Sequence, residues 1–186
     1  MKLRHWIVLS AAMALVSLSA QQEQQKTVVT RVALVAMEKS FDQRIARYSA
    51  DDPIDLLGAT RGLYLDGYGA VFTTELSPVI APGITPFRPV IAKDQVLKLW
   101  EKKKARLPVI RQTMLDMLVS SASGLKDLPV QEQIVVGVNL HYYSWEDKRE
   151  LPSQILMQAS RKSLLDFEAK RITRAQLDSQ LRLREL

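Results

Sequence analysis

An α+β domain is the fold class that the sequence predicts, and three observations lead to it. Apolar residues recur at helical spacing in three segments of the chain. Two segments between them have the apolar runs and turn residues of β-hairpins. A length of 186 residues with 47% hydrophobic residues is typical of one globular domain. The order helix, hairpin, helix, hairpin, helix indicates two αββ-like units plus a closing C-terminal helix, with every strand antiparallel.

Residues 1–20 have the composition of a secretory signal peptide. A basic segment at 1–6 contains two positive charges and no acid, and an apolar run follows at 7–18. The run ends in small residues, so we expect cleavage after Ser19 or Ala20. It is too short to cross a bilayer, which takes ~20 apolar residues. We therefore expect a periplasmic or secreted protein with no transmembrane segment after cleavage.

The rest of the chain is expected to hold a short leader and one domain. Residues 21–27 are mostly glutamine and predict a flexible leader, and residues 28–186 form the predicted domain. Prolines recur at positions 78, 82, 86 and 89. Because proline disrupts a helix and cannot donate to a central strand, residues 77–92 should form an extended surface connection inside the domain.

The first helix of the domain is predicted to begin at Thr27 or Thr30, either of which can act as the N-cap. Charged residues, Glu38 among them, lie opposite a single apolar stripe, so one face of the helix should be buried. Proline at position 53 should end it. The stripe consists of Leu34, Met37, Phe41, Ile45 and Tyr48.

The first hairpin is predicted at about 61–76. Asp66-Gly67 separates two apolar runs that are rich in β-branched and aromatic residues. Such a turn requires positive φ, which Gly67 adopts without a side-chain clash. The same glycines in Asp66-Gly67-Tyr68-Gly69 could let backbone amides approach an anion, but their spacing fits neither a Walker loop nor a dinucleotide fingerprint.

A helical segment is predicted at 93–123. Pro108 lies inside it and must either kink one helix or begin a second, and we expect two stacked helices. Gly124 should cap the C-terminus in the left-handed conformation.

The second hairpin is predicted at about 133–160. Its first strand, at 133–143, alternates apolar residues on one face with mixed residues on the other. Its second strand places Ile155, Met157 and Ala159 on one face. A charged loop between them completes the hairpin.

The C-terminal segment is predicted to be helical. Thr173 and Gln176 have the spacing of a capping box. Helices are therefore expected at 164–171 and 174–186. The last of them should pack Leu177 and Leu181 against the body of the domain.

Composition excludes several kinds of chemistry. The chain contains no cysteine, which excludes disulfides, thiolate metal sites and a cysteine nucleophile. No motif indicates a cofactor or a metal, so we expect neither. The net charge is +6, or +4 without residues 1–20, which contain two basic residues and no acid. This mild charge and a secreted location argue against nucleic acid as a partner.

His141 is the weak catalytic candidate of the sequence. It is the only histidine after residue 20, and a general base at neutral pH is most often histidine. The alternative is that His141 is a structural histidine of a strand, stacked on aromatic neighbours. The sequence contains no Gly-x-Ser-x-Gly elbow that would supply a nucleophile.

Two pairs of carboxylates could in principle act as the acid and base of a glycoside hydrolase. They are Asp66 with Glu75 and Glu146 with Asp147. Their separation in space decides whether this chemistry is available.

Two groups of residues are candidates for a binding surface. One is the basic run at 98–111, which could receive an anionic glycan or lipid surface or could simply be a solvated face. The other consists of hairpin aromatics, which supply stacking area for sugars or peptides. The candidates are Tyr68, Tyr143, Trp145, Lys102, Lys103, Lys104 and Arg106.

These observations favour binding over catalysis. We expect a small exported protein that is not an enzyme and that binds or assists another component of the cell envelope, either a protein or an anionic glycan or lipid surface. One alternative is a small hydrolase with His141 as its general base. The other is a peripheral membrane or anionic-surface binder that uses the basic helix at 98–111.

Overall fold

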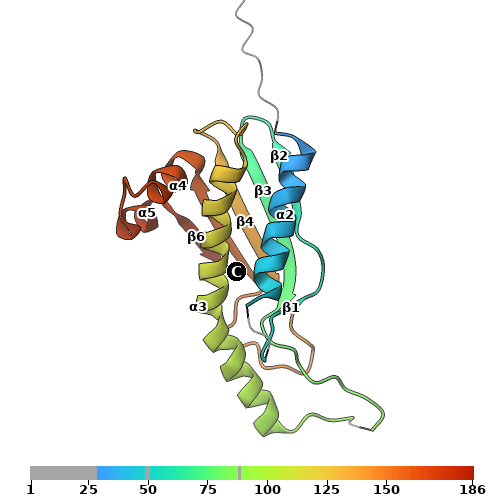
Figure 1. Cartoon of the computed structure of the whole chain (residues 1–186). Coiled ribbons are helices and arrows are strands. Elements are labelled where there is room, and N and C mark those ends of the chain that lie inside the picture. The colour runs from blue at the N-terminus through green and yellow to red at the C-terminus, as the bar shows by residue number, and fades with distance from the viewer. Residues whose placement is uncertain (1–28, 49–50, 88) are drawn as a thin grey trace, which may run out of the picture.

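Helices on one side of a β-sheet make up the described part of the chain (Figure 1). The computed structural model describes residues 29–48, 51–87 and 89–186. The expected signal peptide, its cleavage site and most of the leader lie outside these residues. The described helices and strands fit the α+β class that the sequence predicts. The helices are α2 (Arg31–Ala46), α3 (Lys93–Gly124), α4 (Arg161–Glu168) and α5 (Arg174–Gln180).

The strands form one mixed six-stranded sheet in the order β1-β3-β4-β5-β6, and β2 pairs with the same edge of β3 as β1 does. The β2–β3 and β4–β5 hairpins are both antiparallel, as predicted. The strands are β1 (Asp55–Leu56), β2 (Arg61–Leu65), β3 (Gly69–Ser77), β4 (Gln133–Leu140), β5 (Gln154–Ser160) and β6 (Arg182–Glu185).

The expectation that every strand is antiparallel is wrong at the centre of the sheet. Strands β3 and β4 pair in parallel, from Gly69 opposite Gln133 to Leu76 opposite Leu140. Parallel neighbours need a long crossover connection, and α3 supplies it. The two hairpins are therefore joined side by side into one sheet.

Helix α2 begins at the predicted N-cap, where the Thr30 hydroxyl accepts a hydrogen bond from the Ala33 amide at 3.2 Å. Its predicted stripe faces the core, except that Tyr48 is exposed. Glu38 was expected on the solvent side and is instead buried. Its carboxylate accepts hydrogen bonds from the Arg31 guanidinium at 2.6 Å and from the Gly62 amide at 2.7 Å, which satisfies the buried charge.

The turn between β2 and β3 has the predicted conformation. Gly67 has a φ of 74°, and the Tyr68 amide donates to the Leu65 carbonyl at 3.0 Å. Gly69 also has positive φ, and a Cβ on this residue would lie 1.9 Å from the Gln133 carbonyl oxygen. The glycines are therefore explained by the turn and by the close approach of β3 to β4.

Helix α3 is one continuous helix with Pro108 inside it, so the expected pair of stacked helices is wrong. Figure 1 shows its axis bending between the half before this proline and the half after it. Buried residues on both sides of the bend hold the two halves to the domain. The predicted left-handed glycine cap is also wrong, because the helix runs through Gly124 to a C-cap at Leu125. The lack of a Cβ at Gly124 instead gives room to Met37 of α2.

The second hairpin has the predicted inward faces, but its first strand ends at Leu140 and not at residue 143. The chain after Leu140 turns away into a long loop at 141–153, which carries the charged residues noted in the sequence. His141, Tyr142 and Tyr143 therefore belong to this loop and not to the sheet.

The C-terminal segment departs most from the predicted structure. The capping box is present, since the Thr173 amide donates to Gln176 Oε1 at 2.7 Å and the Gln176 amide donates to Thr173 Oγ1 at 3.3 Å. However, α5 ends at Gln180, and the residues expected to continue it form the edge strand β6. Arg182–Glu185 pair antiparallel with β5, so a strand and not a helix ends the described fold.

A single hydrophobic core lies between the helices and the inner face of the sheet. All four described helices contribute buried side chains to it, including Leu34, Met114, Leu164 and Leu177. Within the described ranges, no helix combines the length and the apolar character needed to span a membrane.

Candidate functional site

The basic run of α3 is the first candidate surface, and the structure pairs its charges with acids from other segments. Lys103 pairs with Glu146, Lys104 with Glu150 and Arg111 with Glu185, while Lys102 and Arg106 share Asp52. Within the run itself, at 98–111, the only acidic residue is Glu101. The basic run therefore forms ion pairs that hold neighbouring loops and strand β6 against α3, and most of its charge is neutralised by these acids.

Lys103 and Glu146 form the most buried of these pairs. Lys103 Nζ donates to Glu146 Oε2 at 2.6 Å, and both side chains are almost completely inaccessible. The ammonium also lies 4.9 Å from the centre of the Tyr142 ring and 3.4 Å from the His141 carbonyl oxygen. Burial lowers the pKa of Lys103, although the Glu146 carboxylate acts in the opposite direction. Lys103 is thus a structural contact of the 141–153 loop and not part of an accessible basic surface.

Arg106 is also buried, and it ties α3 to two connections. Its guanidinium donates to the carbonyl oxygens of Asp52 at 2.7 Å and Pro78 at 3.2 Å. It also pairs with the Asp52 carboxylate and lies over the Tyr48 ring, 5.2 Å from its centroid. Hydrogen bonding from Lys102 and Arg106 outweighs desolvation and holds the pKa of Asp52 below its usual value.

His141 has one carboxylate nearby but no activated hydroxyl. Its Nδ1 lies 3.7 Å from Glu75 Oε1, and its ring meets Tyr143 edge to face at 5.1 Å between centroids. No described serine, threonine or tyrosine hydroxyl is hydrogen bonded to the imidazole. The nucleophile and base pair that a hydrolase of this kind requires is therefore not assembled around His141 in the described residues.

Neither carboxylate pair has the geometry of a glycoside hydrolase. Asp66 lies in the turn before β3 and Glu75 near the far end of β3, so about 20 Å of strand separates them. That distance exceeds the ~5 to 10 Å of catalytic pairs. Glu146 is bound to Lys103, and Asp147 accepts three hydrogen bonds from the Arg149 guanidinium and one from its backbone amide.

The candidate aromatic residues do not form one surface. Tyr68 lies where β3 and β4 begin, because its carbonyl oxygen accepts a hydrogen bond from the Gln133 amide at 2.8 Å. Tyr143 and Trp145 stack on each other at 5.9 Å in the loop beyond the other end of β4. The length of β4, roughly 25 Å, lies between the two groups.

The outer face of the sheet is the feature that the sequence analysis missed. Side chains of a strand alternate between its faces, and the inward set of β3, β4 and β5 fills the core. The outward set is exposed or half-buried, and no described helix packs on it. We call this surface the open face; across its strands it displays Arg61, Leu63, Val71, Thr73, Glu75, Gln133, Val135, Asn139, Gln154, Leu156, Gln158, Arg182 and Arg184.

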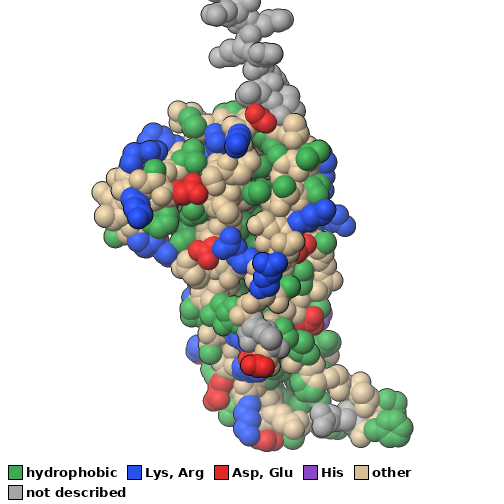
Figure 2. All heavy atoms as spheres, in the orientation of Figure 1, with side chains coloured by type: hydrophobic (Ala, Val, Ile, Leu, Met, Phe, Trp, Pro, Cys, Tyr) green, Lys and Arg blue, Asp and Glu red, His purple; other side chains and the backbone are tan. Residues whose placement is uncertain are grey.

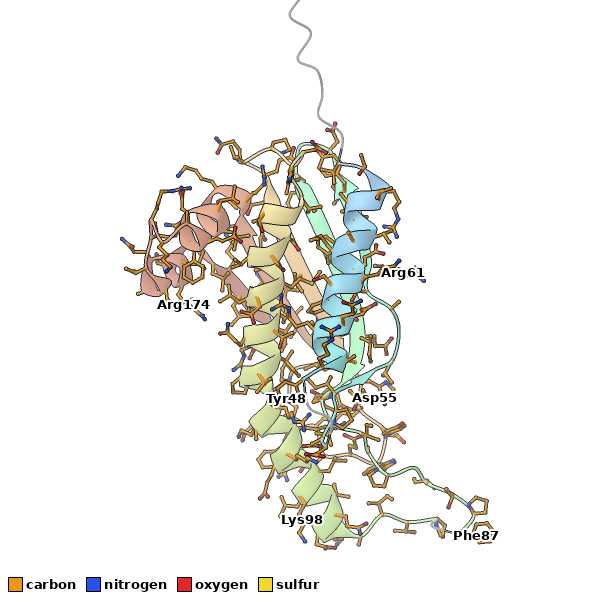
Figure 3. The ribbon with its side chains drawn as sticks, viewed as in Figure 1. Tyr48, Asp55, Arg61, Phe87, Lys98 and Arg174 are labelled. Carbon is orange, nitrogen blue, oxygen red and sulfur yellow. The ribbon has the colours of Figure 1, made fainter. Side chains whose placement is uncertain are left out.

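The strand register places arginines at the edges of the open face. One row across the sheet runs from Arg61 on β2 through Thr73, Gly137 and Leu156 to Arg184 on β6. The next row runs from Leu63 through Val71, Val135 and Gln158 to Arg182. Figure 3 labels Arg61 at the β2 edge. In these two rows the centre of the open face is mostly small or apolar and the edges carry arginines, while Glu75 and Asn139 lie further along β3 and β4.

None of these three arginines has an acidic partner within residues 29–48, 51–87 and 89–186. Arg61, Arg182 and Arg184 take part in no ion pair or side-chain hydrogen bond there, in contrast to the paired cations of α3. A guanidinium in this state keeps its donors available to a ligand.

A polar pocket of about 480 Å³ lies at the β5–β6 corner of the open face. Ser160 and Ser163 lie with their hydroxyls 2.8 Å apart, and the Ser163 hydroxyl donates to Gln180 Oε1 at 2.5 Å. The pocket contains amides, hydroxyls and one guanidinium, and no carboxylate. Its lining residues are Gln133, Gln158, Ser160, Ser163, Gln180 and Arg182.

Alternation in the sequence is enough to assign the residues of β4 and β5 to the two faces of the sheet. It does not predict that the arginines of β6 lie beside them. The sequence predicts a helix at Arg182 and Arg184, and residues two positions apart lie on different faces of a helix. Only the pairing of β6 with β5 brings Arg182 to the pocket and Arg184 to the same face of the sheet.

Neither metal chemistry nor a relative adds to this description. In the part of the chain that the structure describes, no group of three or more histidine, aspartate and glutamate side chains is arranged to hold a metal ion. Comparisons with protein-family models, curated proteins and solved structures find no match.

Proposed function

We propose that this protein is an exported, non-catalytic binding protein of the cell envelope whose open face takes an acidic polysaccharide. The observation that carries the proposal is the set of unpaired arginines Arg61, Arg182 and Arg184 at the edges of an uncovered sheet. Carboxylates are the natural partners of such groups, because a guanidinium can donate two parallel hydrogen bonds to one carboxylate.

The other side chains of the open face favour a ligand rich in hydroxyls. Side-chain amides donate and accept hydrogen bonds, as sugar hydroxyls do. Gln133, Gln158 and Gln180 line the corner pocket together with two serine hydroxyls. A phosphate only accepts hydrogen bonds, whereas sugar hydroxyls can use both the donors and the acceptors of such side chains.

The spacing of the arginines favours an extended ligand. Arg61 and Arg184 end the same row of the sheet and are separated by four strand spacings, roughly 19 Å. A single small anion cannot reach both. A chain of uronic acid sugars laid across the strands can place carboxylates at each edge and its ring carbons over Val71, Val135 and Leu156.

The test is titration calorimetry with oligogalacturonate, its neutral methyl ester and polyglutamate. The acid sugar should bind and its methyl ester should bind at least about 10-fold more weakly, since the ester keeps the hydroxyls but loses the charge. Arg184→Gln and Arg61→Gln should each weaken binding of the acid form. Arg47→Gln is the matched control, because Arg47 is an exposed arginine at the C-cap of α2, away from the open face.

Two outcomes contradict the proposal. Equal weakening by Arg47→Gln would mean that binding follows net charge and not the open face. Equal affinity for polyglutamate and the acid sugar, unaffected by Gln158→Leu, would mean that the arginines recognise an acidic peptide and not a polysaccharide.

Export is a separate part of the proposal and has its own test. The intact mass of protein recovered from the envelope or medium should correspond to a chain that begins at Ala20 or Gln21. Retention of Met1 would contradict cleavage while leaving the sugar titration unaffected.

A further inference from the structure

Residues 78–87 and 89–92 lie in an arm that extends from the end of the domain where α3 begins (Figures 1 and 3). The apolar side chains Ile80, Ile84, Phe87 and Val90 are exposed along it, and Phe87 is 99% accessible. Figure 2 shows hydrophobic side chains at its far end. Exposed apolar residues in this number on one projecting segment indicate an interaction surface.

The arm is anchored at both of its roots. Val79 and Ile91 are buried, and the Val79 carbonyl accepts a hydrogen bond from the Ser77 hydroxyl at 2.7 Å. Arg106 of α3 donates to the Pro78 carbonyl at 3.2 Å. The roots are therefore part of the packed domain, while the segment between them is presented outward.

The composition of the arm suits an apolar environment. Residues 78–92 contain no acidic residue and four prolines. Each proline removes one backbone N–H that would otherwise have to be desolvated when the segment left water. Prolines also restrict the unbound chain, which lowers the entropy lost on binding.

Cations and a further apolar side chain flank the arm at the start of α3. Leu97 is exposed there, and Lys93 and Lys98 lie within the first two turns together with one acid, Asp94, whose carboxylate is 4.0 Å from Lys98 Nζ. Figure 3 shows Lys98 at the same end of the molecule as Phe87. An apolar tip with lysines behind it matches the interface of a bilayer, where acyl chains lie beneath anionic headgroups.

We propose that the arm inserts Phe87 and its apolar neighbours into the interfacial region of a lipid bilayer and holds the domain at a membrane surface. The shape favours lipid over a protein partner. The apolar residues are spread along a convex projection, whereas a protein interface needs a surface of complementary shape on both partners. This inference rests on the arm and the start of α3 and is independent of the open face.

The chain offers a clean labelling experiment because it has no cysteine. Phe87→Cys carries an environment-sensitive fluorophore at the tip, and Val32→Cys carries the same fluorophore at an exposed apolar position on α2. Both variants are made in the full chain, so any contribution of the apolar segment at 7–18 is common to both. With vesicles of phosphatidylcholine and phosphatidylglycerol, the label at 87 should shift to shorter wavelength and brighten, and the label at 32 should not.

Sedimentation with the same vesicles gives the second measurement. Phe87→Ser should lower the partition coefficient by about 10-fold or more, because one phenyl ring is withdrawn from the lipid, whereas Val32→Ser should leave it unchanged. Neither substitution removes a core contact, so loss of folding does not confuse the result. Equal response of both labels, or vesicle binding that 0.5 M salt abolishes and Phe87→Ser does not alter, would overturn the proposal. So would the absence of binding to any vesicle, which would leave the arm as a site for a protein partner.

Discussion

Lys103 Nζ of α3 and Glu146 Oε2 of the 141–153 loop meet at 2.6 Å with both side chains buried. The residues are 43 positions apart in the chain, and their ion pair holds the loop that contains His141 and Tyr143 against α3. A buried ion pair of this kind is costly to break from one side, because the remaining charge has no water to solvate it.

Removal of one partner of this pair should therefore destabilise the domain strongly. Glu146→Gln and Lys103→Met should each lower the free energy of unfolding by about 3 to 5 kcal/mol. The double variant should recover much of that loss, since no charge is left unpaired. Urea denaturation of the four proteins forms a complete double-mutant cycle. Additive effects of the two substitutions would show that the side chains are not coupled.

Three glycines should respond to alanine substitution in a definite order. Gly69→Ala should be the most damaging, because the new Cβ would lie 1.9 Å from the Gln133 carbonyl oxygen in a positive-φ backbone. Gly67→Ala should cost roughly 1 kcal/mol, since it meets no atom but keeps the positive φ. Gly58→Ala is the control, because it has neither a close contact nor positive φ. Denaturant midpoints measure the order, and a stable Gly69→Ala protein would mean that the approach of β3 to β4 is looser than described.

The two leucines of the C-terminal segment should differ in their contribution. Leu177 is completely buried, so Leu177→Ala should cost about 2 to 5 kcal/mol. Leu181 lies at the C-cap of α5 and is only partly buried, so its substitution should cost less. Thermal unfolding at two protein concentrations checks this prediction. A concentration-dependent midpoint for the parent, lost in Leu177→Ala, would instead indicate that the leucine stabilises an oligomer.

Acid should weaken the attachment between α4 and the segment that follows it. Hydrogen bonds from Lys162 and Arg171 hold the pKa of Asp166 below its usual value of 3.8. A carboxyl whose folded pKa is lowered stabilises the fold above its unfolded pKa and loses that effect as the pH falls through the folded pKa. Asp166→Asn should therefore be less stable than the parent at pH 7 and approach it below pH ~3. Urea midpoints between pH 7 and pH 2 give the comparison, and a constant difference at every pH would contradict it.

The incorrect expectations about the fold share one physical cause. Pro108 costs one backbone hydrogen bond and disfavours a helix locally, but buried side chains before and after it, such as Leu107 and Ile110, keep α3 continuous. Residues 182–185 are compatible with a helix, yet pairing with β5 makes them a strand. In both places tertiary contacts outweigh local preference.

The basic run of α3 is paired, and in part buried, for a related reason. A run of lysines and arginines predicts an exposed basic face when the acids that pair with it come from distant segments. The acids that form hydrogen bonds with Lys102, Lys103, Lys104 and Arg111 are 43 to 74 positions away in the chain. Arg61, Arg182 and Arg184 have no acidic partner among the described residues, and no local pattern of the sequence brings them together on the open face.

The amino-acid sequence by itself determined the elements whose cause is local. The cap at Thr30, the positive φ of Gly67, the inward faces of the second hairpin and the capping box at Thr173 follow from hydrogen bonds and steric limits among residues close in the chain. Tertiary structure alone decided the parallel pairing of β3 with β4, the burial of Lys103 with Glu146 and the open face edged by arginines. These features depend on contacts between segments that are far apart in the chain. Hydrophobic burial is not directional, so it favours one set of such contacts over another only when the whole chain is packed.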